Sequence, residues 1–594
     1  MNTLPYMQSN ISKKQKTISS FSGINLTLSK SNNELSESVN MSAKDFPCLS
    51  VREKRSIKAD TKTDVTFIGS KNEIYYTGYT EDSPDTHSVT YGENHLKLTE
   101  EEEHKGKERI CVHLSDSLLI MPDKIVYNLS ENKAEKIPYT KYQDSAIAYK
   151  KAEEDCKSNM MINFPTHIGN LTSTGIVSNS YISNNYTSYL MTFENLKAGD
   201  MVHISFNLQP NAESHDSKYH AYLAKMQKGV DVKIKSIKTT THNLASGTVT
   251  EITGLEFGEN VIDMDGYTAV IIYALTIERK MPDIDYMCTL NNRVWGVKEN
   301  NIRCSRLGDC DCWDDFSSDA FGTLPSACFS TDVDTGGEFT AITPYGGTIL
   351  AFKENCIHKI YGTEPANFTL STLDCNGVAK GAHKTIAMIN GVLYYMGIDG
   401  IYAYDGSRPA LISQKTDIEK LTVLGAGTDG TNYYLSVLKN NRHFLYVYYP
   451  KANIWHTEEI GENKGQFIFF ENKLCAVCSK KIYTISGNEG KEDIKWKFSL
   501  DFDEDTFSTK GYGRLLVRYN LGKDAHFTVT TVCDGNFQKK SVDVRWNRTC
   551  EGTSVLNLPI IKCNKLKVIF EGKGDFTLME MCREYLLANE FINT

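Results

Sequence analysis

The segment Val392-Leu393-Tyr394-Tyr395-Met396-Gly397-Ile398-Asp399-Gly400-Ile401-Tyr402-Ala403-Tyr404 contains two apolar, alternating runs joined by a tight polar turn. Alternation with a period of two puts one face of each strand in a core, and Asp-Gly permits the backbone of a hairpin turn. Residues 433–448 repeat the pattern, with Asn440-Asn441 at the turn. The segment therefore predicts a β-hairpin that recurs along the chain.

Further copies of this hairpin phrase are spread over much of the sequence. They lie at residues 72–76 (a short first copy), 118–127, 294–302, 349–361, 392–404, 433–448 and 474–485. The later copies begin roughly 55, 43, 41 and 41 residues apart, close to the ~40–50 residue period of propeller blades. A lone hairpin is marginally stable in water, and radial packing of such units leaves only short edges. The repeat predicts a mainly β fold with a β-propeller of six or seven blades.

The spacing of the copies also suggests the domain organisation. Residues 1–60 are rich in Ser, Asn and Lys, which indicates an extended N-terminal arm that docks on a partner or on the propeller. Residues 61–144 and 281–500 are predicted to form the propeller, and residues 145–280, where the phrase is absent, a β domain inserted in a blade loop. An acidic hinge at 501–505 opens a predicted C-terminal β-sandwich, residues 501–594.

Composition narrows the classes of function. The chain has 594 residues, 40% of them hydrophobic and 23% charged, as in globular proteins. Its formal net charge of −9 argues against coating of nucleic acid, which needs clustered Lys and Arg, although DNA could slide past an acidic wall. Neither a secretory signal nor an apolar run of the ~20 residues that span a bilayer is visible, so we expect a soluble protein made in a cytoplasm.

The 16 cysteines are expected to be mostly free thiols in core positions. The pair Cys475 and Cys478 has the spacing of half a zinc site, but no second pair lies at a zinc-finger distance. Both residues lie in a segment with the alternating pattern of a β-strand, which favours packing in the core. A local cluster, Cys304, Cys310, Cys312 and Cys328, leaves a metal or disulfide open, although the spacing is irregular and no His is nearby.

Other chemical motifs are weak. Residues 332–338 are as dense in carboxylates as a Ca²⁺ loop but lack its twelve-residue pattern, which favours a turn. The acidic-to-basic run at 100–107 is expected to be a solvated loop. Four histidines, His358, His383, His443 and His456, are scattered over different repeats and suggest no acid/base pair. We therefore expect no enzyme, and nominate no catalytic, cofactor-binding or metal-binding residue and no cofactor.

Several phrases resemble a virion protein of tailed phages and prophages of Gram-positive bacteria. The matching phrases are residues 279–286, 292–296, 305–309 with Trp313, 352–354, 359–362, 365–368, 118–127 and 21–25. The resemblance covers essentially the whole chain, and the Ser/Asn-rich insert fits it less well. In architecture this family is similar to the propeller-bearing tail nozzle and packaged-DNA stabilisation proteins of phage tails, an analogy between folds.

The resemblance implies a structural role in the virion tail or head–tail region. Copies of the chain, six by analogy, would form a homo-oligomeric ring that closes or extends the DNA exit channel. The ring would retain packaged DNA, pass the duplex on at ejection without binding its sequence, and contact neighbouring tail, adaptor or portal proteins. Assembly would take place in the host cytoplasm, with no insertion in a membrane.

Two alternatives stay open. The protein could be a tail-tip or fibre-like protein whose insert binds a host-surface glycan, because residues 179–189 are rich in Tyr and Asn. The protein could also be a polysaccharide-degrading enzyme with a propeller fold. The motivation for this alternative is the fold precedent alone.

Overall fold

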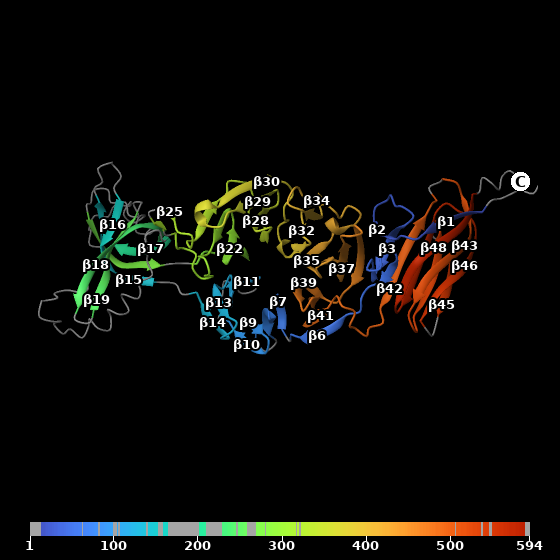
Figure 1. Ribbon diagram of the computed structural model, residues 1–594, viewed down its shortest axis with the longest axis horizontal. Coiled ribbons are helices and arrows are strands. Elements are labelled where there is room, and N and C mark those ends of the chain that lie inside the picture. The colour runs from blue at the N-terminus through green and yellow to red at the C-terminus, as the bar shows by residue number, and fades with distance from the viewer. Residues whose placement is uncertain are drawn as a thin grey trace, which may run out of the picture. The chain divides into compact units, whose positions relative to one another are not determined.

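The structure, a computed structural model, describes residues 13–61, 63–80, 83–98, 104, 107–137, 141–151, 159–163, 201–208, 229–244, 247–257, 269–278, 281–316, 318–319, 322–504, 507–535, 538–545 and 549–587. The chain is mainly β (Figure 1). In these residues the helices are the short 3-10 turns η2 (Pro365–Asn367), η3 (His383–Thr385) and η4 (Ile418–Lys420). None of them is long and apolar enough to cross a membrane.

The described residues include seven four-stranded antiparallel sheets. In the order of the chain, the first three are β7 (Thr63–Lys71), β8 (Glu73–Thr80), β9 (Ser83–Tyr91) and β10 (Asn94–Lys97); β11 (Ile110–Leu114), β12 (Ser117–Met121), β13 (Ile125–Asn128) and β14 (Lys133–Lys136); and β21 (Tyr286–Leu290), β22 (Arg293–Lys298), β23 (Asn301–Cys304) and β26 (Phe329–Asp332). The next two are β27 (Ala341–Tyr345), β28 (Thr348–Lys353), β29 (Cys356–Tyr361) and β30 (Thr369–Asp374); and β31 (Ala387–Ile389), β32 (Val392–Met396), β33 (Ile401–Tyr404) and β34 (Ala410–Leu411). The last two are β35 (Thr422–Thr428), β36 (Tyr433–Lys439), β37 (Arg442–Tyr449) and β38 (Ile454–Glu459); and β39 (Asn463–Phe470), β40 (Lys473–Cys478), β41 (Lys481–Thr484) and β6 (Ser56–Asp60). A small pair, β24 (Ser318–Asp319) and β25 (Gly322–Thr323), lies in the connection before β26.

Six of the seven repeated phrases form the second and third strands of these sheets, whereas the short first copy, residues 72–76, lies at the start of the second strand, β8, alone. Val392 and its neighbours form β32, and the run that begins at Ile401 forms β33. At the turn between β36 and β37, Asn440 and Asn441 have φ angles of 49° and 61°, the left-handed conformation that a two-residue hairpin turn requires. The predicted hairpins are confirmed for the six phrases.

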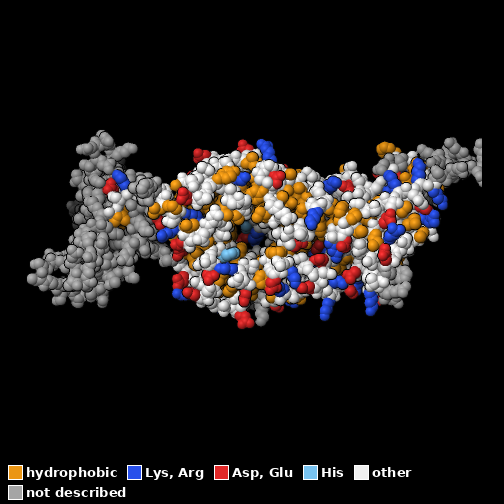
Figure 2. All heavy atoms as spheres, viewed as in Figure 1, with side chains coloured by type: hydrophobic (Ala, Val, Ile, Leu, Met, Phe, Trp, Pro, Cys, Tyr) orange, Lys and Arg blue, Asp and Glu red, His pale blue; other side chains and the backbone are white. Residues whose placement is uncertain are grey.

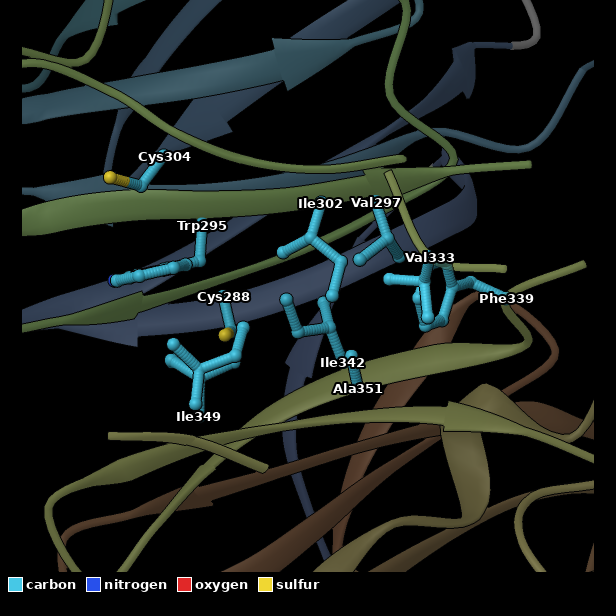
Figure 3. Close-up of a cluster of buried hydrophobic side chains, with 11 residues drawn as sticks. Cys288, Trp295, Val297, Ile302, Cys304, Val333, Phe339, Ile342, Ile349 and Ala351 are labelled. Carbon is cyan, nitrogen blue, oxygen red and sulfur yellow. The ribbon is translucent and has the colours of Figure 1, made fainter. Parts of the chain in front are cut away.

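The chain divides into two compact units, one drawn from residues 1–99, 353–357 and 374–594 and the other from residues 100–352 and 358–373. In the second unit, consecutive sheets pack face to face. Trp295 and Val297 of β22 share a buried cluster with Ile349 and Ala351 of β28 (Figure 3). A second buried cluster joins the β11–β14 sheet to the β21 sheet through Leu119, Val294 and their neighbours.

Sheets of the first unit pack in the same consecutive order. Tyr394 of β32 contacts Tyr433 of β36, with ring centroids 5.6 Å apart. Val447 of β37 and Ala476 of β40 belong to one buried cluster. On the other side of the last sheet, Cys475 packs with Val65 of β7. Second strands such as β36 and β40 are therefore buried on both faces, and not on the single face that alternation predicts.

The last of the seven sheets is completed by a strand from early in the chain. Strand β6 pairs antiparallel with β41, so that Ser56 faces Thr484 and Ile57 faces Tyr483 (Figure 1). The outer edge of β41 is therefore covered, which removes an exposed strand edge.

Residues 1–60 were expected to form an extended arm, and this expectation is wrong for the described residues 13–60. Five of their strands are β1 (Lys14–Ile18), β2 (Ser22–Ile24), β3 (Glu34–Val39), β4 (Met41–Ser42) and β5 (Leu49–Val51). They pair with strands near the other end of the sequence: β1 and β5 with β48 (Phe576–Leu587), and β3 with β42 (Lys495–Phe502). Leu35 and Met41 are fully buried there. Burial of these apolar side chains stabilises a segment that is otherwise mostly polar.

Two six-stranded sheets result. The remaining strands are β43 (Lys510–Leu521), β44 (His526–Cys533), β45 (Gln538–Arg545), β46 (Cys550–Cys563) and β47 (Leu566–Lys573). One sheet has the order β4-β5-β48-β43-β46 with β1 added at β48, and the other β2-β3-β42-β47-β44-β45. Aromatic rings join the sheets: Trp496 stacks on Phe576 with centroids 4.4 Å apart. We call this pair of sheets the terminal sandwich; the predicted sandwich exists but begins at residue 495 and contains the early strands.

The acidic hinge expected at residues 501–505 is also corrected for its described part. Phe502 is the buried end of β42. Glu504 is buried and accepts hydrogen bonds from Nε and Nη2 of Arg583 at 2.5 and 2.9 Å. The guanidinium of Arg583 lies over the Phe502 ring, 4.1 Å from its centroid. These residues are a buried part of the sandwich.

The predicted insert is a closed barrel of six strands. Its strands are β15 (Lys141–Lys151), β16 (Asn159–Asn163), β17 (Met201–Leu208), β18 (Val230–Leu244), β19 (Gly247–Phe257) and β20 (Ala269–Glu278). Buried apolar side chains on its strands include Val202, Ile204, Val232, Ile234, Leu255, Phe257 and Ile277. The first and last strands pair at the base, where Lys141 faces Glu278. The chain therefore enters and leaves the barrel at neighbouring points.

Candidate functional site

A cavity of about 1310 Å³ lies beside the last sheet, in the first unit. We call it the Arg55 cavity. Its lining comes from the segment before β6, the end of β6, strands β8 to β10, and the turn between β40 and β41. The strand pairing between β6 and β41 brings these distant segments together.

Arg52 and Arg55 are the two arginines of this lining, and their side chains are almost equally buried. The Arg55 side chain is 8% exposed. Nη2 donates to Oε2 of Glu458 at 2.5 Å and Nη1 to the carbonyl oxygen of Glu459 at 2.6 Å. Its Nε is buried and has no hydrogen-bond partner. Burial lowers the pKa of Arg55, and Arg52 nearby lowers it further. A buried donor without a partner costs free energy unless a ligand or water satisfies it.

Glu492 fixes the two arginines with respect to each other. Its Oε1 accepts hydrogen bonds from Nη1 of Arg52 at 2.7 Å and from the backbone N–H of Arg55 at 2.8 Å. Hydrogen bonds from Arg52 hold the pKa of Glu492 below its usual range, against the effect of burial. The charged wall of the cavity is therefore preorganised.

Hydroxyl groups line another part of the cavity. Tyr76 donates through its phenol to the carbonyl oxygen of Thr61 at 3.3 Å, and Oγ1 of Thr90 lies 3.0 Å from Nδ1 of His95. Thr61 donates in turn to the carbonyl oxygen of Lys480 at 2.9 Å. Burial raises the pKa of Tyr76, so the phenol stays neutral. The cavity can thus donate and accept hydrogen bonds over much of its lining.

A smaller cavity, of about 700 Å³, lies in the second unit. Nδ1 of His203 lies 2.6 Å from Oδ1 of Asp231 at its edge. Lys124 and Lys298 both pair with Asp283, at 2.8 and 3.5 Å. Its charged groups are largely paired with one another.

The cysteine motifs are core features. Cys475 and Cys478 are both buried on β40 but contact different neighbours, Cys475 the cluster with Val65 and Cys478 the cluster with Val447. A spacing of three residues on a strand puts side chains on opposite faces, so these thiols cannot share a metal ion. The prediction of core packing is confirmed for this pair.

In the local cysteine cluster, Cys304, Cys310 and Cys328 are buried and Cys312 is partly buried. Burial raises the pKa of Cys304 to about 11 and that of Cys310 to about 12, and Sγ of Cys328 donates to the carbonyl oxygen of Cys312 at 3.4 Å. Neutral thiols are poor metal ligands. Within the described residues, no group of three or more His, Cys, Asp or Glu could hold a metal ion.

Arg293 belongs to a phrase of the phage resemblance, and its role is structural. Its guanidinium donates to the carbonyl oxygens of Ser305, Ala327 and Pro325, at 2.7 and 2.6 Å for the first two. It thereby ties the long connection before β26 to strand β22.

Two of the four histidines are held in the core by hydroxyl groups. His358 contacts Thr335 and Thr372 through its two ring nitrogens, both at 2.9 Å. Nδ1 of His456 lies 2.9 Å from the hydroxyl of Ser38, and burial lowers the pKa of His456 to about 3. The carboxylate-rich segment at 332–338 connects β26 to β27, as expected for a turn.

Sequence reasoning did not find the Arg55 cavity. Arg55 was read as part of a polar arm, and Lys480 only as a hairpin corner. The sequence does show acidic and basic residues on both sides of β6. They do not indicate a cavity unless it is known that β6 pairs with β41. The Tyr/Asn-rich residues 179–189 and most of the loop at 100–107 lie outside the described residues.

Comparison with known proteins gives no family. No family model matches the chain, and no curated protein matches it. Among solved structures, it is similar to an exo-β-1,3-galactanase from Phanerochaete chrysosporium in complex with galactose, at 9% identity and a TM-score of 0.19, over 89% of this chain and 100% of that one. It is also similar to KlHsv2 with loop 6CD replaced by a Gly-Ser linker, at 14% identity and a TM-score of 0.21, over 39% and 84% of the two chains.

A third similar structure is TmCBM61 in complex with β-1,4-galactotriose. The identity is 14%, the TM-score 0.13, and the match spans 16% of this chain and 63% of that one. Overlaps this low in TM-score and identity identify neither a family nor a function.

Proposed function

We propose that the protein is a non-enzymatic structural protein of a phage tail, built on a β-propeller of six or seven blades. Seven four-stranded sheets of one topology support the propeller, as does their packing in consecutive order within each unit. Completion of the last sheet by β6 is the way a propeller closes its ring of blades.

The observation that carries the proposal is that the first sixty residues pair with late strands in two places. Strand β6 completes the last sheet, and strands β1 to β5 are built into the terminal sandwich beside β42 and β48. Pulling the early segment away would break backbone pairing in three sheets at once. Such interlocking suits a subunit that must keep its shape while packaged DNA presses on it.

Assembly follows the phage resemblance. We propose that copies of the chain, six by analogy, form a ring at the tail or head–tail junction that retains packaged DNA and lets it pass at ejection. Neighbouring tail, adaptor or portal proteins would be its partners in the virion. On the face shown in Figure 2, Lys and Arg side chains are interspersed with Asp and Glu, and the net charge is −9. Such a surface offers DNA no broad basic patch to adhere to.

Electron microscopy of the purified protein and of the phage particle tests this proposal. The expected result is a closed ring on the tail axis with a hole wide enough for a duplex, together with the polypeptide in the mass spectrum of purified particles. Absence of the polypeptide from the particles would refute the virion role. A monomer, or density that projects sideways from the tail, would refute the ring and favour a tail-tip protein that binds the host surface.

A further inference from the structure

The Arg55 cavity has the chemistry of a binding site that a purely structural subunit does not need. Its lining carries four basic and four acidic side chains, namely Arg52, Arg55, Lys480, Lys481, Asp60, Glu93, Glu459 and Glu492. Balanced charge gives no net attraction to a polyanion such as DNA. The balance favours a neutral ligand that makes many hydrogen bonds.

Both directions of hydrogen bonding are available in the cavity. Carboxylates accept, guanidinium and ammonium groups donate, and the hydroxyls of Thr90 and Tyr76 can do either. Sugar hydroxyls also donate and accept. The rings of Tyr76 and Tyr483 add apolar faces with a polar tip, which suit the C–H faces of a sugar ring.

Size and a fixed charged wall complete the argument. A volume of about 1310 Å³ exceeds the roughly 300–1,000 Å³ typical of sites for small ligands, so the cavity can hold several linked units. The guanidinium of Arg55 is fixed by Glu458 and Glu459, and that of Arg52 by Glu492, so the charged wall is in place before a ligand arrives.

We propose that the Arg55 cavity binds a neutral oligosaccharide. Arg52 and Arg55 form the charged wall against which the sugar lies, Tyr76 and Tyr483 contact sugar rings, and the exposed Glu93 and Lys481 hydrogen-bond hydroxyl groups at the rim. This role goes beyond the proposed structural function and does not depend on it.

Calorimetric titration of the full-length protein tests the proposal. The probes are the hexasaccharides of β-1,4-glucose, β-1,4-xylose, β-1,4-galactose and β-1,4-N-acetylglucosamine at millimolar concentration, with a short DNA duplex as a polyanion. Saturable binding of at least one sugar is expected, with no binding of the duplex. Absence of binding for all four sugars, or preferential binding of the duplex, would overturn the proposal.

Variants locate the binding. Arg55→Gln removes the guanidinium that Glu458 and Glu459 hold in the wall of the cavity, and is expected to weaken sugar binding at least tenfold. Because this variant could be unstable, the double variant Glu93→Ala with Lys481→Ala removes two exposed rim groups and is expected to weaken binding at least threefold at an unchanged Tm. Lys420→Ala, at an exposed position outside the cavity, is the matched control and should bind as the wild type does. Wild-type affinity in the rim variant and in a folded Arg55→Gln protein would place the sugar elsewhere and refute the assignment.

Discussion

Glu504 and Arg583 form an ion pair that is almost wholly inaccessible to water, with both side chains at most 1% exposed. Desolvation of two charges is offset only while they remain paired. We expect Glu504→Gln to lower the free energy of unfolding by about 3–5 kcal/mol, because it leaves the Arg583 charge buried without its counter-ion. Urea unfolding followed by tryptophan fluorescence measures the change.

A double variant tests whether the loss of stability comes from leaving one charge unpaired. Glu504→Met combined with Arg583→Met replaces both charges by apolar side chains of similar length, and its stability should lie closer to wild type than that of Glu504→Gln. A double variant as unstable as the single one would contradict this account.

His456 should make stability depend on pH. Its folded-state pKa of about 3 lies below the roughly 6.5 expected in the unfolded chain. The unfolded state therefore binds the proton first, so this contribution is complete above about pH 6.5 and is lost as the pH falls toward 3, by at most about 1.4 kcal/mol per pH unit. Chemical unfolding at several pH values measures the slope.

The variant His456→Gln isolates this effect from that of the carboxylates. It keeps a group that can hydrogen-bond Ser38 but does not titrate, so its stability should fall less steeply between pH 6.5 and 3. Identical slopes for the two proteins would show that another group is responsible.

Cys475 and Cys478 allow a simple test of the metal question at this position. Because their side chains contact different buried clusters, we expect a strong zinc chelator to leave Tm unchanged. Calorimetry with and without the chelator, accompanied by metal analysis of the purified protein, checks this. A stoichiometric zinc content with a lowered Tm after chelation would refute it.

At the scale of the element, the early strands are integral to two parts of the fold. Without residues 1–60, the last sheet loses β6 and exposes the edge of β41, and the terminal sandwich loses β1 to β5. We expect a protein of residues 61–594 to be insoluble and co-expression of residues 1–60 as a separate chain to restore soluble protein. Sedimentation of the lysate and co-purification of the two chains provide the readout; a soluble, monomeric 61–594 protein would contradict the expectation.

The inner strands of the sheets could be predicted because they are apolar runs on either side of a turn with a clear sequence, although strands such as β36 and β40 are buried on both faces. Outer strands such as β30, whose six residues are nearly all exposed, carry no such alternation. Strand β3 was missed for a different reason: its partner is far away in the chain, Leu35 facing Leu500. The candidate cavity shares this difficulty, since Arg55 meets Glu458 only through the fold.

At the scale of the whole molecule, the barrel begins and ends at neighbouring points in space. Lys141 and Glu278 are Cα partners, so their backbones lie about 5 Å apart. We expect replacement of residues 141–278 by a short Gly-Ser linker to leave a folded protein with a Tm within a few degrees of wild type. Circular dichroism and gel filtration check this outcome; aggregation of the shortened protein would show that the barrel supports the sheets beside it.

The pairing of β3 with β42 has a consequence for the order of synthesis. The ribosome makes Leu35 well before Leu500, its partner in the sandwich. At common translation rates the delay is on the order of 20–90 s, during which β3 lacks its partner β42 and β1 lacks its partner β48. The nascent chain must keep these edges from pairing with its own later hairpins or with other chains. Newly made protein should therefore bind chaperones through its first sixty residues until translation ends, and slower translation should lower the yield.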